Sequence, residues 1–170
     1  MDKLTSSQRH LCMSHIHSRD TKPELKVRKW LWNHGYRYRL NVKGVPGKPD
    51  IVMRHYRTAI FVNGCFWHGH ENCDKFKMPK TNIEFWENKI KRNQERDRQN
   101  YQVLHDNGWQ VIVIWECQLT KDTLEATMLK VEVLLHDYFL KTCAKTPRTY
   151  ALPDEEDYFM AAEEQADYGF

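Results

Sequence analysis

The stretch 50–73 constrains the fold most, because two strand-like segments there lead into a group of metal-type ligands. The segments 50–53 and 58–62 are short and rich in β-branched residues, as paired strands are, and a turn around His55 separates them. Because the second segment is apolar throughout, we expect it to be the central strand of a sheet. Two cysteines and two histidines follow within residues 65–73.

These ligands predict a zinc site. Cys65, His70 and Cys73 lie on one loop, and thiolate and imidazole are the donors that zinc prefers. A closed tetrahedral site needs four donors, and Cys117 supplies a fourth at the end of another strand-like segment. We therefore predict a structural Cys3His zinc site that joins two loops. His68 is a competing ligand, because only its order in the sequence distinguishes it from His70, and separate buried thiols are the alternative.

The other elements follow from local signals. A capping box at Thr21 opens a helix that stops at Gly35, and a second at Thr81 opens a long helix to about Asp106. An apolar stripe predicts a third helix over about residues 122–140. Residues 36–42 alternate strictly between apolar and polar side chains, which predicts a half-exposed strand.

Residues 109–115 predict a further buried strand, so helices flank three or four short strands. The expected fold class is therefore α/β, a small mixed β-sheet flanked by helices. At 170 residues the chain should form one domain with one core. It has no apolar run of about 20 residues and no apolar segment at its start, so we expect a cytoplasmic protein without a membrane span or secretory signal.

The charge distribution favours a polyanionic partner. Residues 154–170 hold 7 of the 23 acidic residues and none of the 26 basic ones, which leaves residues 1–153 with a net charge of about +10. A body this basic suits nucleic acid, although surface Lys and Arg also serve solubility alone. We expect residues 1–20 to form an N-terminal arm and residues 146–170 a flexible acidic tail. The five cysteines, an odd number, argue against a disulfide framework and for metal ligands or free thiols.

A set of motifs carries a family resemblance. They are PGKPD at 46–50, FVNGCFWHGH at 61–70, PKT at 79–81, EFW at 84–86, NQERDR at 93–98 and WEC at 115–117. In this order, over about residues 8–140, the chain resembles the very-short-patch-repair (Vsr) mismatch endonucleases. The resemblance implies a PD-(D/E)xK restriction-endonuclease-like core with a structural zinc site, within an endonuclease domain at residues 21–145.

The resemblance also implies a function. Vsr-like enzymes nick double-stranded DNA 5′ of the thymine in a T:G mismatch, the lesion left by deamination of 5-methylcytosine, using Mg2+ for chemistry and Zn2+ for structure. We accordingly expect a monomeric enzyme of the bacterial nucleoid, with mismatch-repair proteins as candidate partners.

By position in the motifs, the resemblance assigns catalytic roles. Asp50 is the main Mg2+ ligand, together with the backbone carbonyl of Val62. His68 is the general base or acid, since an imidazole titrates near neutral pH, and Asp97 orients it. Glu24 reaches the site through water; helix capping is its alternative role.

Two features depart from the family pattern. Some members carry histidine where this chain has Asn63, which can form hydrogen bonds but cannot transfer a proton. The second strand also lacks the (D/E)xK carboxylate and lysine, so metal binding rests on Asp50. Asn63 is therefore a supporting residue, and a zinc-stabilised DNA-binding module without cleavage is the alternative function. A third hypothesis places zinc in the hydrolytic centre, with His68 and His70 as ligands.

Aromatic and basic side chains form the predicted DNA interface. By the resemblance, Phe66, Trp67 and Trp86 wedge into the base stack, which opens most easily at a mispair; a place in the core is their alternative. Four basic residues of the predicted long helix are candidates for phosphate contacts, with a solvated face as the alternative. They are Lys89, Arg92, Arg96 and Arg98.

Overall fold

The computed structural model describes residues 5, 7–8, 11, 14 and 19–144, and the statements below concern these residues. The predicted acidic tail lies outside them, as does most of the predicted N-terminal arm. One compact unit spans Met1–Phe139, and a second begins at Leu140. The fold described here is that of the first unit.

The elements form a small mixed sheet with helices around it. In chain order they are α2 (Lys22–Asn33), β1 (Ile51–Met53), β2 (Thr58–Asn63), α3 (Ile83–Asp106), β3 (Gln110–Trp115), a 3-10 helix (Glu116–Leu119) and α4 (Leu124–Ala144). The sheet order is β1-β2-β3, with β1 antiparallel and β3 parallel to β2. The predicted fold class and the central position of β2 are confirmed.

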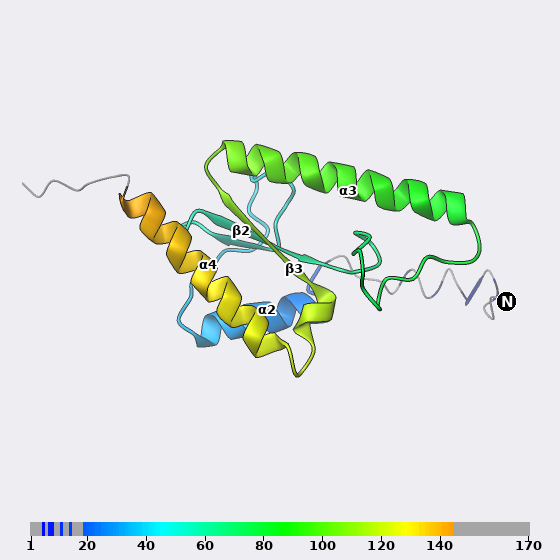
Figure 1. The fold of residues 1–170 in the computed structure, drawn as a ribbon, viewed down its shortest axis with the longest axis horizontal. Helices are drawn as coiled ribbons and strands as arrows, with labels where there is room; N and C mark the ends of the chain where they lie inside the picture. The colour runs from blue at the N-terminus through cyan, green and yellow to red at the C-terminus, as the bar shows by residue number, and fades with distance from the viewer. Residues whose placement is uncertain (1–4, 6, 9–10, 12–13, 15–18, 145–170) are drawn as a thin grey trace, which may run out of the picture. The chain divides into compact units, whose positions relative to one another are not determined.

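The sheet separates two hydrophobic clusters. Helix α3 covers one face, and α2 and α4 cover the other (Figure 1). The larger cluster joins β-strand residues such as Ile60 to apolar side chains of α2 and α4, and the smaller one joins Phe61 to Leu104 of α3. Because side chains alternate along a strand, Asn63 shares the α3 face with Phe61. This alternation directs the end of β2 toward α3.

The structure confirms one predicted helix start and corrects another. Thr21 caps α2, and its Oγ1 accepts a hydrogen bond from the Glu24 N–H. The capping box predicted at Thr81 is wrong, because α3 begins after Asn82, whose side chain makes no capping hydrogen bond. Asn82 instead has φ 54°, a left-handed conformation that asparagine tolerates.

The strand predicted over residues 36–42 is also wrong. The segment forms one isolated bridge, in which the backbone groups of Arg39 and Val52 exchange two hydrogen bonds of 2.9 and 2.8 Å. Tyr36 packs into the larger core cluster, but Leu40 is 37% exposed. Asn41 has φ 50°, which breaks an extended backbone, so the alternating pattern ends without a ladder.

Candidate active site and metal centre

The predicted catalytic residues line one cleft. It has a volume of about 630 Å³ and lies where the start of α2, the loop before β1 and the end of β2 face the loop after β2 and the middle of α3. Its lining includes Glu24, Asp50, Val62, Asn63, Trp67, His68, Lys89, Arg96 and Asp97. Residues separated by more than 70 positions in the sequence are thus brought to one place.

Asp50 is a carboxylate held in a largely buried position. Its Oδ2 accepts a hydrogen bond of 2.7 Å from the Val62 N–H. Burial raises the pKa of Asp50 to about 6, and the negative charge of Glu24 acts in the same direction, whereas the Val62 hydrogen bond and the charge of Arg28 lower it. A cation beside such a carboxylate would favour its ionised form. The position therefore fits a ligand for a hard divalent ion.

His68 and Asp97 form a hydrogen-bonded pair across the cleft. His68 Nδ1 contacts Asp97 Oδ2, and Arg96 lies 3.3 Å from the other oxygen of Asp97. Burial alone would raise the pKa of Asp97, but the hydrogen bond and charge of His68, with the charge of Arg96, hold it below its usual value. An ionised Asp97 fixes the proton of His68 on Nδ1, which leaves Nε2 to exchange a proton with water.

Glu24 is 4% exposed and fully hydrogen-bonded. Its Oε1 accepts from the Thr21 hydroxyl at 2.7 Å, and its Oε2 accepts from the Asp20 N–H and from Arg28 Nη2 at 3.0 and 2.7 Å. These contacts match the capping role considered for Glu24. Both oxygens of Glu24 are thus engaged by protein groups, and the residue lines the cleft beside Asp50.

The predicted zinc ligands form one cluster. The ligand atoms of Cys65, His70, Cys73 and Cys117 all lie within 4.8 Å of one another, and His70 Nδ1 is 3.4 Å from Cys117 Sγ. Zinc bonds of about 2.3 Å to sulfur and 2.0 Å to nitrogen place tetrahedral ligands roughly 3.5–3.8 Å apart, so the cluster fits a zinc ion after a small contraction. His68 stands apart, paired with Asp97.

The environment of the three thiols differs. Burial raises the pKa of Cys65 to about 12 and also raises that of Cys117. Burial acts in the same direction on Cys73, but hydrogen bonds from the Lys75 N–H and from Cys65 lower its pKa overall. The Trp115 ring stacks on His70, with centroids 4.0 Å apart and planes 3° apart, which fixes the imidazole orientation.

Helix α3 holds the loop that carries these ligands. Asn93 Nδ2 donates to the Trp67 carbonyl at 2.9 Å, and Gln94 Nε2 donates to the carbonyls of His68 and Gly69 at 3.3 and 3.1 Å. Gly69 has φ +59°, and a Cβ there would lie 2.6 Å from Gln94 and from Ile90. Only glycine fits this close approach of the loop to α3.

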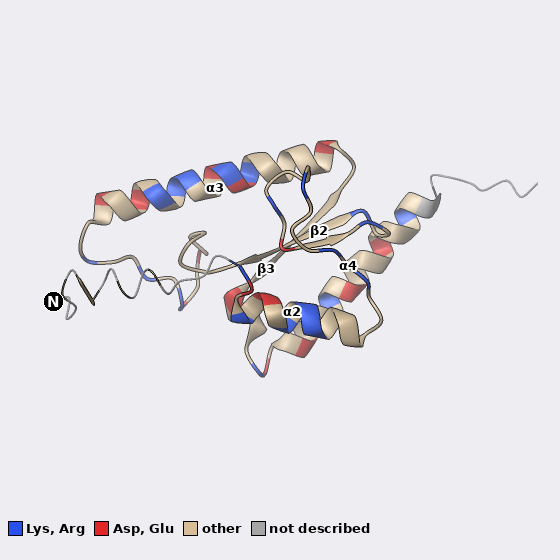
Figure 2. Cartoon of the chain, turned by 180° about the vertical axis from the view of Figure 1, so that it is seen from behind, with Lys and Arg blue, Asp and Glu red and all other residues tan. Residues whose placement is uncertain are grey.

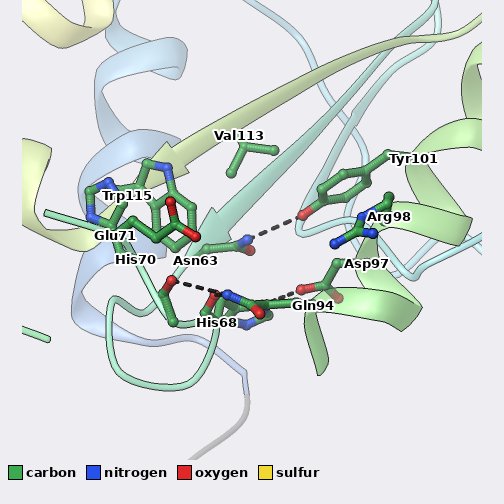
Figure 3. A pocket seen from close by; sticks show the side chains of 11 residues that line it. Asn63, His68, His70, Glu71, Gln94, Asp97, Arg98, Tyr101, Val113 and Trp115 are labelled. Atoms are coloured by element: carbon green, nitrogen blue, oxygen red, sulfur yellow. Dashed lines mark hydrogen bonds and ion pairs between the residues drawn. The ribbon is translucent and has the colours of Figure 1, made fainter. Parts of the chain in front are cut away.

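A second cavity of about 500 Å³ lies beside the first. Asn63, His68 and Asp97 line both cavities. Figure 3 shows Asn63 and Tyr101 pointing toward each other, and the Asn63 Nδ2 donates to the Tyr101 hydroxyl at 3.1 Å. Arg98 lines this second cavity together with Tyr101.

The predicted aromatic wedge is a cluster of rings beside the cleft. Phe66 lies 5.2 Å from both Trp67 and Trp86 between ring centroids, and the two tryptophans are 6.0 Å apart. Phe85 extends the cluster, with its centroid 5.2 Å from Trp86, and is 57% exposed. The rings contact one another at the surface and lie outside both core clusters.

The four basic residues of α3 fall into two groups. Lys89, Arg92 and Arg96 are spaced by three and four residues and so share one side of the helix. The Lys89 Nζ lies 5.8 Å from the ring centroids of both Trp67 and Phe85, which joins the basic stripe to the aromatic cluster. Arg98 is about 200° around the helix from Arg96 and faces the second cavity.

Comparison with known proteins decides the family. The family profile of DNA mismatch endonuclease Vsr matches residues 1–75. The chain is 51% identical over 118 residues to the type II nicking enzyme V.NmeAIP of Neisseria meningitidis. The matched stretch covers 69% of this chain and 84% of that enzyme. This chain is a member of the Vsr DNA mismatch endonuclease family.

Two further relatives agree. V.XorIIP, a type II nicking enzyme of Xanthomonas oryzae pv. oryzae, is 40% identical over 131 residues, which is 76% of this chain and 96% of that enzyme. The DNA mismatch endonuclease Vsr of Escherichia coli K12 is 43% identical over 118 residues, 69% of this chain and 73% of that protein. The resemblance expected from the motifs is confirmed.

Within this Vsr fold, several residues at the site were not predicted from the sequence. Tyr101 belongs to a long polar helix, and nothing in its periodicity distinguishes it from a solvated side chain. Asn93 and Gln94 stand in the NQERDR motif, but no role was predicted for either of them. Phe85 is the middle residue of the EFW motif, but no role was predicted for it. No helix among the described residues is long and apolar enough to cross a membrane.

Proposed function

We propose that this protein is a Mg2+-dependent DNA endonuclease that nicks double-stranded DNA 5′ of the thymine in a T:G mismatch, as very short patch repair of deaminated 5-methylcytosine requires. One observation carries the proposal: Asp50 and the His68–Asp97 pair open onto the same cleft. Membership of the Vsr family supports it, and so do the names of the relatives, which are DNA mismatch or nicking endonucleases.

The cleft residues have distinct roles in this proposal. Asp50 and the Val62 backbone carbonyl would hold Mg2+, which supplies charge neutralisation at the scissile phosphate and an activated water. His68 would exchange a proton at Nε2 with a water molecule in the cleft, as general base or acid, and Asp97 would keep its ring oriented. Glu24 contributes through water, and Asn63 holds a polar group in place without moving a proton.

The remaining surfaces would bind the substrate. Phe66, Trp67 and Trp86 would enter the base stack beside the mismatch, where unstacking costs least. Lys89, Arg92 and Arg96 would contact phosphates along α3, and Arg98 would do so from the second cavity. Cys65, His70, Cys73 and Cys117 would hold a structural Zn2+. A set of three thiolates and one imidazole leaves no open coordination position for chemistry.

The wider setting belongs to the same proposal. The catalytic core would be of the PD-(D/E)xK type within residues 21–145, preceded by the arm and followed by the acidic tail. The enzyme would act as a monomer on DNA of the bacterial nucleoid, in the cytoplasm, with mismatch-repair proteins as partners.

A nicking assay tests the function. Purified protein with Mg2+ is incubated with an end-labelled duplex that carries one T:G mismatch, beside the matched T:A duplex. We expect one nick 5′ of the mispaired thymine, absent from the T:A duplex and from Asp50→Ala. The control Asp106→Ala, which removes an exposed carboxylate at the end of α3, should nick normally. Mismatch binding without a nick at any Mg2+ concentration would instead support a zinc-stabilised DNA-binding module.

A further inference from the structure

We propose that Tyr101 is a positioning residue of the nicking reaction, which acts by holding the Asn63 side chain at the catalytic cleft. This inference rests on the proposed function, because a positioning role requires a reaction. It concerns two residues: Asn63, whose amide can form hydrogen bonds but cannot transfer a proton, and Tyr101, which lies outside every motif.

The first step is the position of the Tyr101 hydroxyl. Tyr101 follows Asp97 by one helical turn, so both side chains leave α3 on the same side. The Tyr101 ring packs on Phe61, with centroids 4.9 Å apart at 57°, as part of the cluster between the sheet and α3. This packing fixes the ring, and the ring carries its hydroxyl to the end of β2.

The second step is what the hydroxyl holds. The Asn63 Nδ2 donates to the Tyr101 hydroxyl at 3.1 Å, and Asn63 is 6% exposed. The Nδ2 end is therefore engaged, and no described residue donates a hydrogen bond to the Oδ1 end. The outer torsion of an asparagine side chain is broad, so an unheld amide would sample several orientations. Tyr101 limits the amide to one.

The third step is the place of that amide in the site. Asn63 follows Val62 directly and lines both cavities together with His68 and Asp97. An amide oxygen in this place accepts a hydrogen bond from water or from a protonated group, which keeps a reactant oriented toward His68. A histidine at this position could also transfer a proton, whereas asparagine can only orient a reactant. It can do so only if its own amide group is held in one orientation.

The fourth step concerns pH. Burial raises the pKa of Tyr101 to about 12, and the charges of Asp97 and Asp50 add to this effect, whereas the hydrogen bond from Asn63 lowers it. The hydroxyl therefore keeps its proton over the working range of the enzyme. Loss of the hydroxyl should slow the reaction by the same factor at every pH.

Single-turnover nicking of the T:G duplex with saturating enzyme tests the inference. We expect Tyr101→Phe, which keeps the packed ring, to lower the rate constant about tenfold, as the loss of one hydrogen bond does. The affinity for DNA and the shape of the pH–rate profile should stay unchanged. Asn63→Ala should lower the rate as much, and adding Tyr101→Phe to it should cost nothing more.

A matched control removes a different tyrosine hydroxyl. Tyr138 donates to the Gly108 carbonyl at 2.9 Å, and Tyr138→Phe should nick at the wild-type rate. A wild-type rate for Tyr101→Phe overturns the inference, and so does a tenfold loss that persists in the Asn63→Ala background. A wild-type protein that nicks no T:G duplex contradicts the proposed function itself, and the inference falls with it.

An independent measurement needs no activity. In NMR spectra, the side-chain amide protons of Asn63 should exchange slowly with water in the wild type and faster in Tyr101→Phe, while Tyr138→Phe leaves them unchanged. Equal exchange of the Asn63 amide in wild type and Tyr101→Phe would mean that Tyr101 does not hold it, and would overturn the inference even in a variant of altered rate.

Discussion

The pKa of Asp50 links the proposed catalytic role to stability. Burial raises it from 3.8 to about 6 in the folded protein. Between these two values the folded state binds more protons than the unfolded chain, so the free energy of unfolding falls as pH rises through this window. Above it, the buried charge destabilises the metal-free fold by up to about 3 kcal/mol.

We therefore predict that Asp50→Asn abolishes nicking and yet raises the melting temperature of Mg2+-free protein by several degrees at neutral pH. The amide can still accept the Val62 hydrogen bond but carries no charge. Asp97→Asn is the matched control. It should lower the melting temperature at neutral pH, because the pKa of Asp97 is lowered in the fold and its negative charge is therefore stabilising. Thermal melts of the two variants and the wild type, recorded from acid to neutral pH without Mg2+, measure these changes in melting temperature. A lower melting temperature for Asp50→Asn at neutral pH would contradict the prediction.

At the level of residues, sequence motifs could identify candidate site residues, but not the contacts between residues that lie far apart in the sequence. Asp50 and His68 stand in motifs, and both side chains line the same cleft. The Asn63–Tyr101 bond joins residues 38 positions apart, and no local pattern encodes it. Gln94 does stand in the NQERDR motif, but its contact with the His68 loop depends on how α3 packs on the sheet and could not be predicted from that motif.

At the level of elements, the two errors share a cause. Strict alternation at residues 36–42 and the Thr81–Glu84 spacing are local signals, and each was interrupted by an asparagine with positive φ. Asn41 ends an extended segment after one bridge, and Asn82 starts α3 without a side-chain cap. Asparagine adopts the left-handed conformation more readily than other residues with a Cβ, so both positions could have been flagged as breaks.

The contact between α3 and the ligand loop gives a prediction at this level. Gly69→Ala should destabilise the fold by about 2 kcal/mol or more, because a Cβ at φ +59° would lie 2.6 Å from Gln94 and Ile90. The loop carrying His68 and His70 must then move, so zinc content and nicking rate should both fall. Gly35→Ala is the control that measures backbone strain alone, since φ is +82° there and no atom lies within 4 Å of an added Cβ. Equal melting temperatures for the two variants would show that the close packing is unimportant.

At the level of the whole molecule, the metal cluster joins the loop after β2 to the 3-10 helix after β3. Removal of zinc should therefore lower the melting temperature, with the greatest gain in hydrogen exchange in the loop that follows β2. Burial raises the pKa of Cys65 to about 12, so zinc uptake at neutral pH must release protons. Calorimetry in buffers of different ionisation enthalpy measures that release. Metal-free protein that melts like the zinc-loaded form but has lost nicking would instead place zinc in the chemistry.

The distribution of basic side chains leads to a last prediction, which concerns DNA binding. Figure 2 shows Lys and Arg along α3 and on the neighbouring loops, and Lys89, Arg92 and Arg96 share one side of that helix. Each phosphate contact releases counterions, so alanine at each of these three positions should reduce the slope of log K against log salt by about 1. The control Lys130→Ala, on the opposite side of the sheet in α4, should leave the slope unchanged.

Binding to matched and mismatched duplexes, measured over a range of salt concentrations, separates charge from recognition. Loss of the three basic side chains should weaken binding to both duplexes equally, because phosphate contacts carry no sequence information. Trp67→Ala should act differently: the salt slope stays constant, while the preference for the T:G duplex falls, since a wedge gains most where the base stack opens easily. If Trp67→Ala weakened both duplexes alike, the aromatic cluster would be a structural feature of the ligand loop, and mismatch recognition would have to reside elsewhere in the molecule.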